Sequence, residues 1–293
     1  MLAAVFLRIL FVNLNAAGSP GEISPRVYTT IPLAFAYYYV YGRLVGRDED
    51  FLRGDARLRA AEVHCFLGTV TVAALMRFEL DLDWVAATWA ALVLILMALA
   101  WRTGRRIFLH QAYFMGFAVL FRTILHNLYE RSYFPAPFWR GRWVVVGTVA
   151  AILALTLVLT FQLERREPAP DSIHHPWARA LFALERYPEQ VFFFIPFILL
   201  TWLLAVELRH GLVTLGWGVE AVAVFLVALS VGERSYRLSA LGLLLLCVLK
   251  IAFVDVWRLA PRDRYVTFIA LGSALLLVSF LYSKYREVLR EYL

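Results

Sequence analysis

Three basic side chains lie inside apolar stretches, and each is followed five residues later by an amide or a carboxylate. The pairs are Arg8 with Asn13, Arg122 with Asn127, and Lys250 with Asp255. A cation inside the hydrocarbon layer of a membrane costs ~2.5–3.5 kcal/mol on insertion scales, so it should face protein or water and have a partner. Five residues turn an α-helix by ~500°, which leaves the second side chain ~140° from the first. We therefore expect the partners to come from neighbouring helices.

Acidic residues that end two other apolar stretches are the nearest candidates for these partners. We expect Glu79 to pair with Arg122, and Glu207 or Asp255 to pair with Lys250. A buried charge is tolerated in a membrane only when it is paired or solvated. The sequence thus predicts two polar clusters, each close to one end of a helix bundle.

Two further arginines, Arg142 and Arg264, begin later apolar stretches and should reach the same depth. Because arginine binds phosphate through a planar fork of donors, each cluster could hold an anionic headgroup or the phosphate of a glycan-lipid. The alternative is an ion-pair network that fixes the register of the helices. Repetition of the pattern along the chain favours this structural alternative. The predicted ligand-binding set is Arg122, Asn127, Arg142, Lys250, Asp255, Arg264, Glu79, Glu207 and Glu220.

The composition predicts that these residues sit in a polytopic membrane protein. Hydrophobic types make up 61% of the 293 residues, charged types make up 17%, and the mean hydropathy is +0.68. Such values exclude a disordered chain and a soluble nucleic-acid binder, even at a net charge of +7. The two cysteines lie in apolar runs and indicate no disulfide framework. The fold class is an all-α bundle of ten transmembrane helices, near 1–16, 26–43, 58–78, 84–101, 106–128, 142–162, 187–207, 211–230, 235–257 and 264–284.

The distribution of the positive charges predicts the orientation of these helices. Most arginines and lysines lie in alternate connections, including 44–57 and 163–186, and fewer lie on the opposite side. The positive-inside rule then places both termini in the cytoplasm. The basic connections are expected to contact anionic lipid. Segment 173–186 is amphipathic and could lie on the inner surface of the membrane.

An internal repeat organises the chain. Residues 62–127 match residues 190–255 without a gap, including Glu79 with Glu207 and Trp89 with Trp217. Because such residues are scarce within spans, their coincidence indicates duplication in parallel orientation. The expected organisation is a two-helix partial repeat at 1–43, four-helix units at 58–162 and 187–284, and a cytoplasmic linker at 163–186.

Glu220 stands apart, because its equivalent in the other unit is Leu92. An unpaired carboxylate in a span suggests a proton relay or an ion site, and a pairing role with Arg209 or His210 competes with that interpretation.

Histidines offer little further chemistry. His64, His110 and His126 fall within predicted spans but have no metal-ligand spacing, so we expect hydrogen-bonded roles. The adjacent His174 and His175 are expected to be solvated. No catalytic or metal-ligating motif is present in the sequence, and the sequence identifies no cofactor.

The last fifty residues carry a family resemblance. Lys250, Asp255 and Arg264, the Leu271–Gly272 pair and the run 279–282 resemble the C-terminal signature of an uncharacterised bacterial family of predicted membrane proteins, the domain of unknown function two-three-three-nine. The resemblance implies a multi-span architecture in the inner membrane of a bacterial cell, with no assigned activity. Members are usually much longer, which fits a first stretch that is short before Arg8.

Three functional hypotheses remain open at this point. The first is a non-enzymatic membrane protein that binds lipid or an amphipathic anionic ligand at polar clusters in the outer leaflet, in transport or as a scaffold. The second is an accessory subunit of a larger membrane complex. The third is a membrane-embedded enzyme acting on lipid-linked substrates, with Glu79, Glu207 or Glu220 as base. Expected partners are membrane lipids and other membrane subunits, and no nucleic acid is expected.

Overall fold

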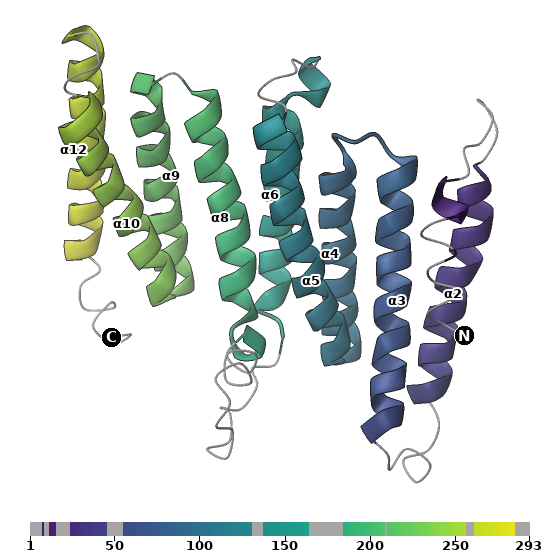
Figure 1. Cartoon of the computed structure of the whole chain (residues 1–293). Helices are drawn as coiled ribbons and strands as arrows, with labels where there is room; N and C mark the ends of the chain where they lie inside the picture. Colours follow the sequence, from purple (N-terminus) through teal and green to yellow (C-terminus); the bar gives the residue numbers. More distant parts are fainter. Residues whose placement is uncertain are drawn as a thin grey trace. The chain divides into compact units, whose positions relative to one another are not determined.

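The computed structural model describes residues 8, 12–15, 24–45, 55–130, 137–163, 184–208, 210–255 and 261–284. Every regular element in these segments is helical (Figure 1). A helix satisfies its own backbone donors and acceptors, so it is the element that an apolar chain of this composition forms in lipid. The predicted all-α membrane architecture is confirmed.

Among the described residues, seven helices are long and apolar enough to span a membrane. The predicted stretch at 26–43 forms a helix, and the one at 264–284 contains a shorter apolar helix, Phe268–Lys284. Most of the predicted stretch at 1–16 lies outside the described residues, so the total of ten stays a prediction. The seven candidate spans are Ala60–Glu79, Val85–Thr103, Arg106–Tyr129, Arg142–Thr160, Pro188–Glu207, Leu212–Val231 and Arg234–Val254.

The chain divides into two compact units, Met1–Phe197 and Ile198–Leu293. Within the first unit, α2 packs against α3, and α4 packs against both α5 and α6 (Figure 1). Between α2 and α6 lie a short 3-10 helix, η5, and a π-helix, η3, that continues α5. The bounds are η1 Asn13–Asn15, α2 Pro25–Val45, α3 Asp55–Glu79, α4 Val85–Thr103, α5 Arg106–Arg122, η3 Thr123–Tyr129, η5 Phe138–Arg140 and α6 Arg142–Thr160.

Helix α8 (Pro188–Glu207) begins in the first unit and ends in the second. The second unit then contains α9 (His210–Val231), α10 (Arg234–Lys250), the π-helix η6 (Ile251–Asp255) and α12 (Pro261–Lys284). Helix α9 is central to it, because both α10 and α12 pack against α9. The domain boundaries predicted from the repeat rest on sequence similarity and stay a prediction.

The core of the first unit lies along α4. Ala90 and Val93 are fully buried and Leu96 is 1% exposed, while Phe35 on α2 and Phe121 on α5 remain largely exposed. Small side chains on α4 let α5 and α6 approach closely, as is common between helices in membranes. The exposed aromatic and aliphatic side chains are suited to contact with lipid.

A chain of polar side chains joins three helices of this unit. The Tyr38 hydroxyl on α2 and the Thr69 hydroxyl on α3 are 2.8 Å apart, and Thr69 donates to Gln111 Oε1 on α5 at 2.8 Å. Both Thr69 and Gln111 are buried. Such hydrogen bonds hold helices in register where the surrounding lipid offers no competing partner.

Several local features recur at positions that the predicted sequence repeat makes equivalent. Gly104 and Gly232 have φ angles of 66° and 78°, and no other described residue has a positive φ. Each glycine N–H bonds to the carbonyl four residues earlier, at 2.9 and 3.0 Å. A residue with a Cβ is strained in this left-handed conformation, so glycine ends both helices. The π-helices also begin at equivalent positions, Thr123 and Ile251.

Candidate functional site

Three polar features of the fold are candidates for function. One surrounds the turn between α3 and α4, residues 79–84, which we name the acidic turn after its three carboxylates. The second is a hydroxyl–carboxyl pair between α8 and α9. The third is a cavity at the junction of α4 and α5. Each feature lies within one compact unit.

Arginines from two separate elements contact the acidic turn. Arg26, at the start of α2, donates from Nη1 to the Phe78 carbonyl at 2.9 Å and lies 3.7 Å from Glu79 Oε1. Arg140 of η5 pairs with Asp81, with Nη2 and Oδ2 2.5 Å apart. These contacts tie the beginning of α2 and the segment before α6 to the same turn.

Arg122 reaches the acidic turn from the end of α5. Its Nη2 donates to the Leu82 carbonyl at 3.0 Å. The predicted pairing of Arg122 with Glu79 is therefore wrong: Arg26 has the Glu79 contact, and Arg122 bonds to the backbone farther along the turn. Arg122 thus has a backbone carbonyl as its partner, and the pattern of charged residues in the sequence does not reveal such a partner.

Asn127 bonds to the same turn as Arg122, although it lies five residues later. Its Nδ2 donates to the Asp83 carbonyl at 2.9 Å. The sequence argument assumed an α-helix, in which the two side chains point apart. The structure has a π-helix from Thr123 to Tyr129 instead, and the i→i+5 bonding of a π-helix brings residues five apart toward one face.

His126 lies between two carboxylates. Its Nε2 is 3.2 Å from Asp83 Oδ1, and its Nδ1 forms a short contact with Glu130 Oε2. The Asp83 side chain is fully buried, whereas the Glu130 side chain is 56% exposed. The prediction from sequence placed neither Asp81 nor Asp83 in a site. The alternation of acids with leucines just before α4 was the available signal.

The basic residue of the second unit has a different kind of partner. Lys250 donates from Nζ to the Thr214 hydroxyl of α9 at 2.8 Å. Glu207 and Arg142 are half-buried at helix ends. The side chains of Asp255 and Arg264 lie outside the described residues, so the predicted pairing of Lys250 with Glu207 or Asp255 stays a prediction.

Glu220 is buried within α9, with 5% of the residue exposed. Its Oε1 accepts a hydrogen bond from the Thr201 hydroxyl of α8 at 2.9 Å. Trp217, one turn earlier on α9, donates from Nε1 to the Thr201 carbonyl, also at 2.9 Å. The predicted competitors Arg209 and His210 have side chains outside the described residues.

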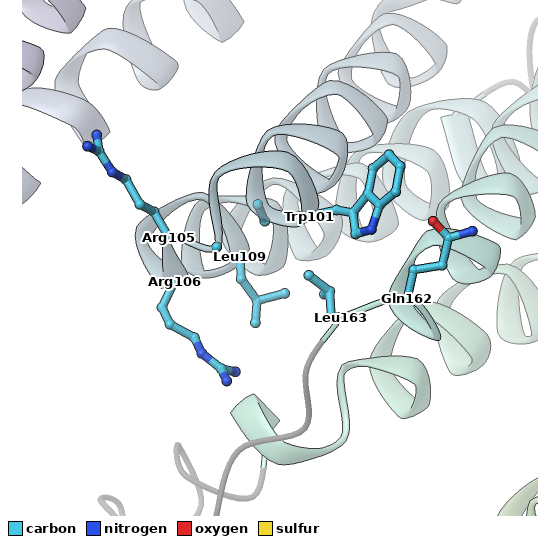
Figure 2. A pocket seen from close by; sticks show the side chains of 8 residues that line it. Trp101, Arg105, Arg106, Leu109, Gln162 and Leu163 are labelled. Atoms are coloured by element: carbon cyan, nitrogen blue, oxygen red, sulfur yellow. The ribbon is translucent and has the colours of Figure 1, made fainter.

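A cavity of about 290 Å³ opens where α4 ends and α5 begins. Figure 2 shows Trp101 and Gln162 facing Arg106 across it, with Leu109 and Leu163 between them. Arg105 belongs to the rim, but its guanidinium extends away and lies 5.6 Å from the centre of the Tyr41 ring. The lining therefore combines apolar surface with polar groups at its edge, as binding sites for amphiphilic ligands do.

The backbone adds donors at this cavity. Helix α5 begins at Arg106, and no side chain caps its first turn from Arg105. The first N–H groups of a helix lack intrahelical partners and carry partial positive charge. Together with the basic side chains, they make this cavity favourable for an anion.

The remaining histidines of the described spans have ordinary partners. His64 Nδ1 is 2.6 Å from the Ala60 carbonyl, and His110 Nε2 is 2.8 Å from Glu185 Oε1. No cluster of three or more histidine, cysteine, aspartate or glutamate side chains suited to a metal ion occurs among the described residues. His174 and His175 lie outside them.

The model of a family described as predicted membrane protein (DUF2339) matches residues 1–285, so the chain belongs to that family. The family resemblance of the last fifty residues is thereby confirmed and extends over nearly the whole chain. No curated protein and no solved structure matches the chain.

Proposed function

We propose that this polytopic membrane protein binds the anionic headgroup of a lipid or lipid-linked ligand, and that the headgroup enters the cavity between α4 and α5. The observation that carries the proposal is the amphipathic lining of this cavity at an uncapped helix start. Its volume of about 290 Å³ is near the lower limit of ligand pockets. A headgroup fits such a space, while the acyl chains stay in the membrane.

The charges around the cavity favour an anion. Arg106 donates to the Glu185 carbonyl at 3.2 Å, which holds its guanidinium at the rim. A phosphate group accepts several hydrogen bonds at once, and the first turn of α5 offers backbone donors. Trp101 and Leu109 would contact the glycerol part of the ligand, since both line the same cavity.

We further propose that this end of the unit faces the cytoplasm of a bacterial cell and that both termini lie on that side. The support is the positive-inside rule applied to the connections between spans. The cavity would then lie in the inner leaflet of the cytoplasmic membrane, where anionic lipids attract basic side chains.

For the acidic turn we propose a structural role, the alternative that the sequence left open. Arg26, Arg122 and Arg140 each contact a carboxylate or a carbonyl of the turn or its flank. These contacts join the ends of several helices of one unit, so the turn acts as a scaffold that keeps them in register. Binding of an outer-leaflet ligand by these residues stays a prediction.

We also propose that the two four-helix segments arose by duplication. Trp89 donates from Nε1 to the Ala73 carbonyl at 2.9 Å, and Trp217 makes the same bond to the Thr201 carbonyl at the same distance. Both members of the second bond are the repeat equivalents of the members of the first. The repeated glycine helix ends and π-helices support the same proposal.

Lipid titration of the purified full chain tests headgroup binding. Native mass spectrometry in a non-ionic detergent would compare phosphatidylglycerol with phosphatidylcholine, which is zwitterionic. We expect tighter binding of phosphatidylglycerol. We expect Arg106→Gln to weaken it about tenfold, because Arg106 holds its guanidinium at the rim of the cavity and a hydrogen bond to a charged group contributes ~1.5–3 kcal/mol.

Arg102→Gln is the matched control. Arg102 is exposed on the same turn of chain but does not line the cavity. This variant should bind both lipids as the unchanged protein does. Equal affinity of the unchanged protein for the two lipids would refute the proposal, as would an equal loss in the Arg102 and Arg106 variants. Stoichiometric co-purification of another membrane chain would favour the accessory-subunit hypothesis.

A further inference from the structure

Glu220 places a carboxyl group near the middle of a candidate membrane span. The span runs from Leu212 to Val231, so at 1.5 Å per residue Glu220 lies about 12 Å from its first residue and about 16 Å from its last. The residue is only 5% exposed. Water therefore does not solvate this carboxyl group as it would at a helix end.

The carboxyl group has few partners. Oε1 accepts from the Thr201 hydroxyl at 2.9 Å, and Oε2 is buried without a hydrogen-bond partner among the described residues. A single neutral donor compensates an ionised carboxylate poorly in an apolar setting. None of the described charged side chains on α8, or on the helices packed against α9, contacts this carboxyl group. They are Glu189, Glu207, Arg234, Arg237, Lys250 and Lys284.

The first unit provides a comparison at the same structural position. Its Trp89 bond to the Ala73 carbonyl matches the Trp217 bond to the Thr201 carbonyl. At the positions of Thr201 and Glu220, however, the first unit has Ala73 and Leu92. This way of joining two helices therefore requires neither the hydroxyl nor the acid.

We propose that Glu220 is a proton-binding site inside the membrane, with Thr201 as the donor that stabilises its ionised form. The acid and its hydroxyl partner occur together in one unit and are absent together from the other. An ionisable side chain in a span is costly and marks a proton or ion pathway by default. The exchange is Glu–COOH to Glu–COO⁻ with release of one proton, and the Thr201 O–H then bonds to the charged oxygen. This inference does not rest on headgroup binding.

Carbodiimide labelling of the full chain in liposomes tests this site. Dicyclohexylcarbodiimide partitions into the bilayer and reacts with a protonated carboxyl: the acid O–H adds across one C=N bond, and the O-acylisourea rearranges to a stable N-acylurea. We expect mass spectrometry of peptides to find the adduct on Glu220, and its yield to fall as the pH is raised from about 5 to about 9.

Three variants make the test specific. Glu220→Gln should remove the adduct, while Glu207→Gln at the end of α8 should leave the Glu220 adduct unchanged. Thr201→Ala removes the donor to the ionised form, so labelling should persist to higher pH. A Thr201→Ala and Glu220→Leu double variant reproduces the pair of the first unit and should fold, which intrinsic tryptophan emission can check.

Several results would overturn the assignment. The proton site is excluded if no adduct forms on Glu220 at the lowest pH, or if the yield is constant over the whole pH range. Protection of Glu220 by sodium ions at constant pH would also overturn it, because the ligand would then be a metal cation rather than a proton.

Discussion

His126 contacts two carboxylates, and we expect very different coupling energies between His126 and each of them. Nε2 faces Asp83, whose side chain is fully buried, and Nδ1 faces Glu130, whose side chain is 56% exposed. A hydrogen bond to a buried charged group contributes ~1.5–3 kcal/mol. An exposed pair four residues apart on a helix contributes only ~0.3–0.5 kcal/mol. We therefore expect the Asp83 contact to stabilise the fold several times more than the Glu130 contact.

Two double-mutant cycles measure this difference. The first combines His126→Phe with Asp83→Ala, and the second combines His126→Phe with Glu130→Ala. Because each cycle subtracts the effects of the single variants, other contacts of Asp83 and Glu130 cancel to first order. Reversible unfolding of the full chain in mixed lipid–detergent micelles, or steric trapping, supplies the free energies of unfolding.

The expected coupling is ~1.5–3 kcal/mol with Asp83 and under about 0.5 kcal/mol with Glu130. Equal couplings would refute the reasoning, because burial would then have no influence on the strength of the contact. A larger coupling with Glu130 would refute it as well, and would indicate that the short exposed contact dominates. Asn127→Leu in the same assay is a reference for loss of a neutral donor to the acidic turn.

Two further predictions test the proposed equivalence of the two four-helix segments. Trp89→Phe and Trp217→Phe each remove one indole donor, so each should lower the free energy of unfolding by ~0.5–1.5 kcal/mol in the same assay. Destabilisation of only one variant would contradict the structural equivalence. Gly104→Ala and Gly232→Ala each place a Cβ on a residue in the left-handed conformation. Each should lower the free energy of unfolding by ~1–2 kcal/mol, measured as lowered thermal stability. Unchanged stability in either variant would show that the backbone at that position does not adopt the left-handed conformation.

The fold class was predictable because hydropathy acts over whole segments. A stretch such as Arg142–Thr160 is apolar on every face, and lipid leaves the helix as its means of satisfying the backbone. The predicted stretch at 264–284 likewise lies within one helix, α12 (Pro261–Lys284).

The partners of the polar residues were only partly predictable. That Arg122 needs a partner follows from its place in an apolar stretch, but the carbonyl of Leu82 has no signature in the sequence. The π-helix after Arg122 also changed the outcome, since it brings Asn127 to the same turn. Local helix geometry of this kind depends on tertiary contacts, and helical periodicity alone does not report it.

The uncapped start of α5 was equally invisible in the sequence. Arg105 and Arg106 could be read as topology signals alone, and nothing in their spacing indicated a cavity beside Trp101 and Gln162. Helices α5 and α6 separate Gln162 from Trp101 along the chain. Only the packing of α6 against α4 brings these residues to one cavity.

The wide helical turn after Arg122 has a consequence for how chains of this kind tolerate changes in length. A π-helical segment amounts to an α-helix with an extra residue accommodated in place. Loss of one of the residues Thr123, Ile124 and Leu125 would restore the narrower coil and rotate everything downstream by about 100°. His126 and Asn127 would then leave Asp83, so this deletion would change side-chain orientation while the helix itself persisted.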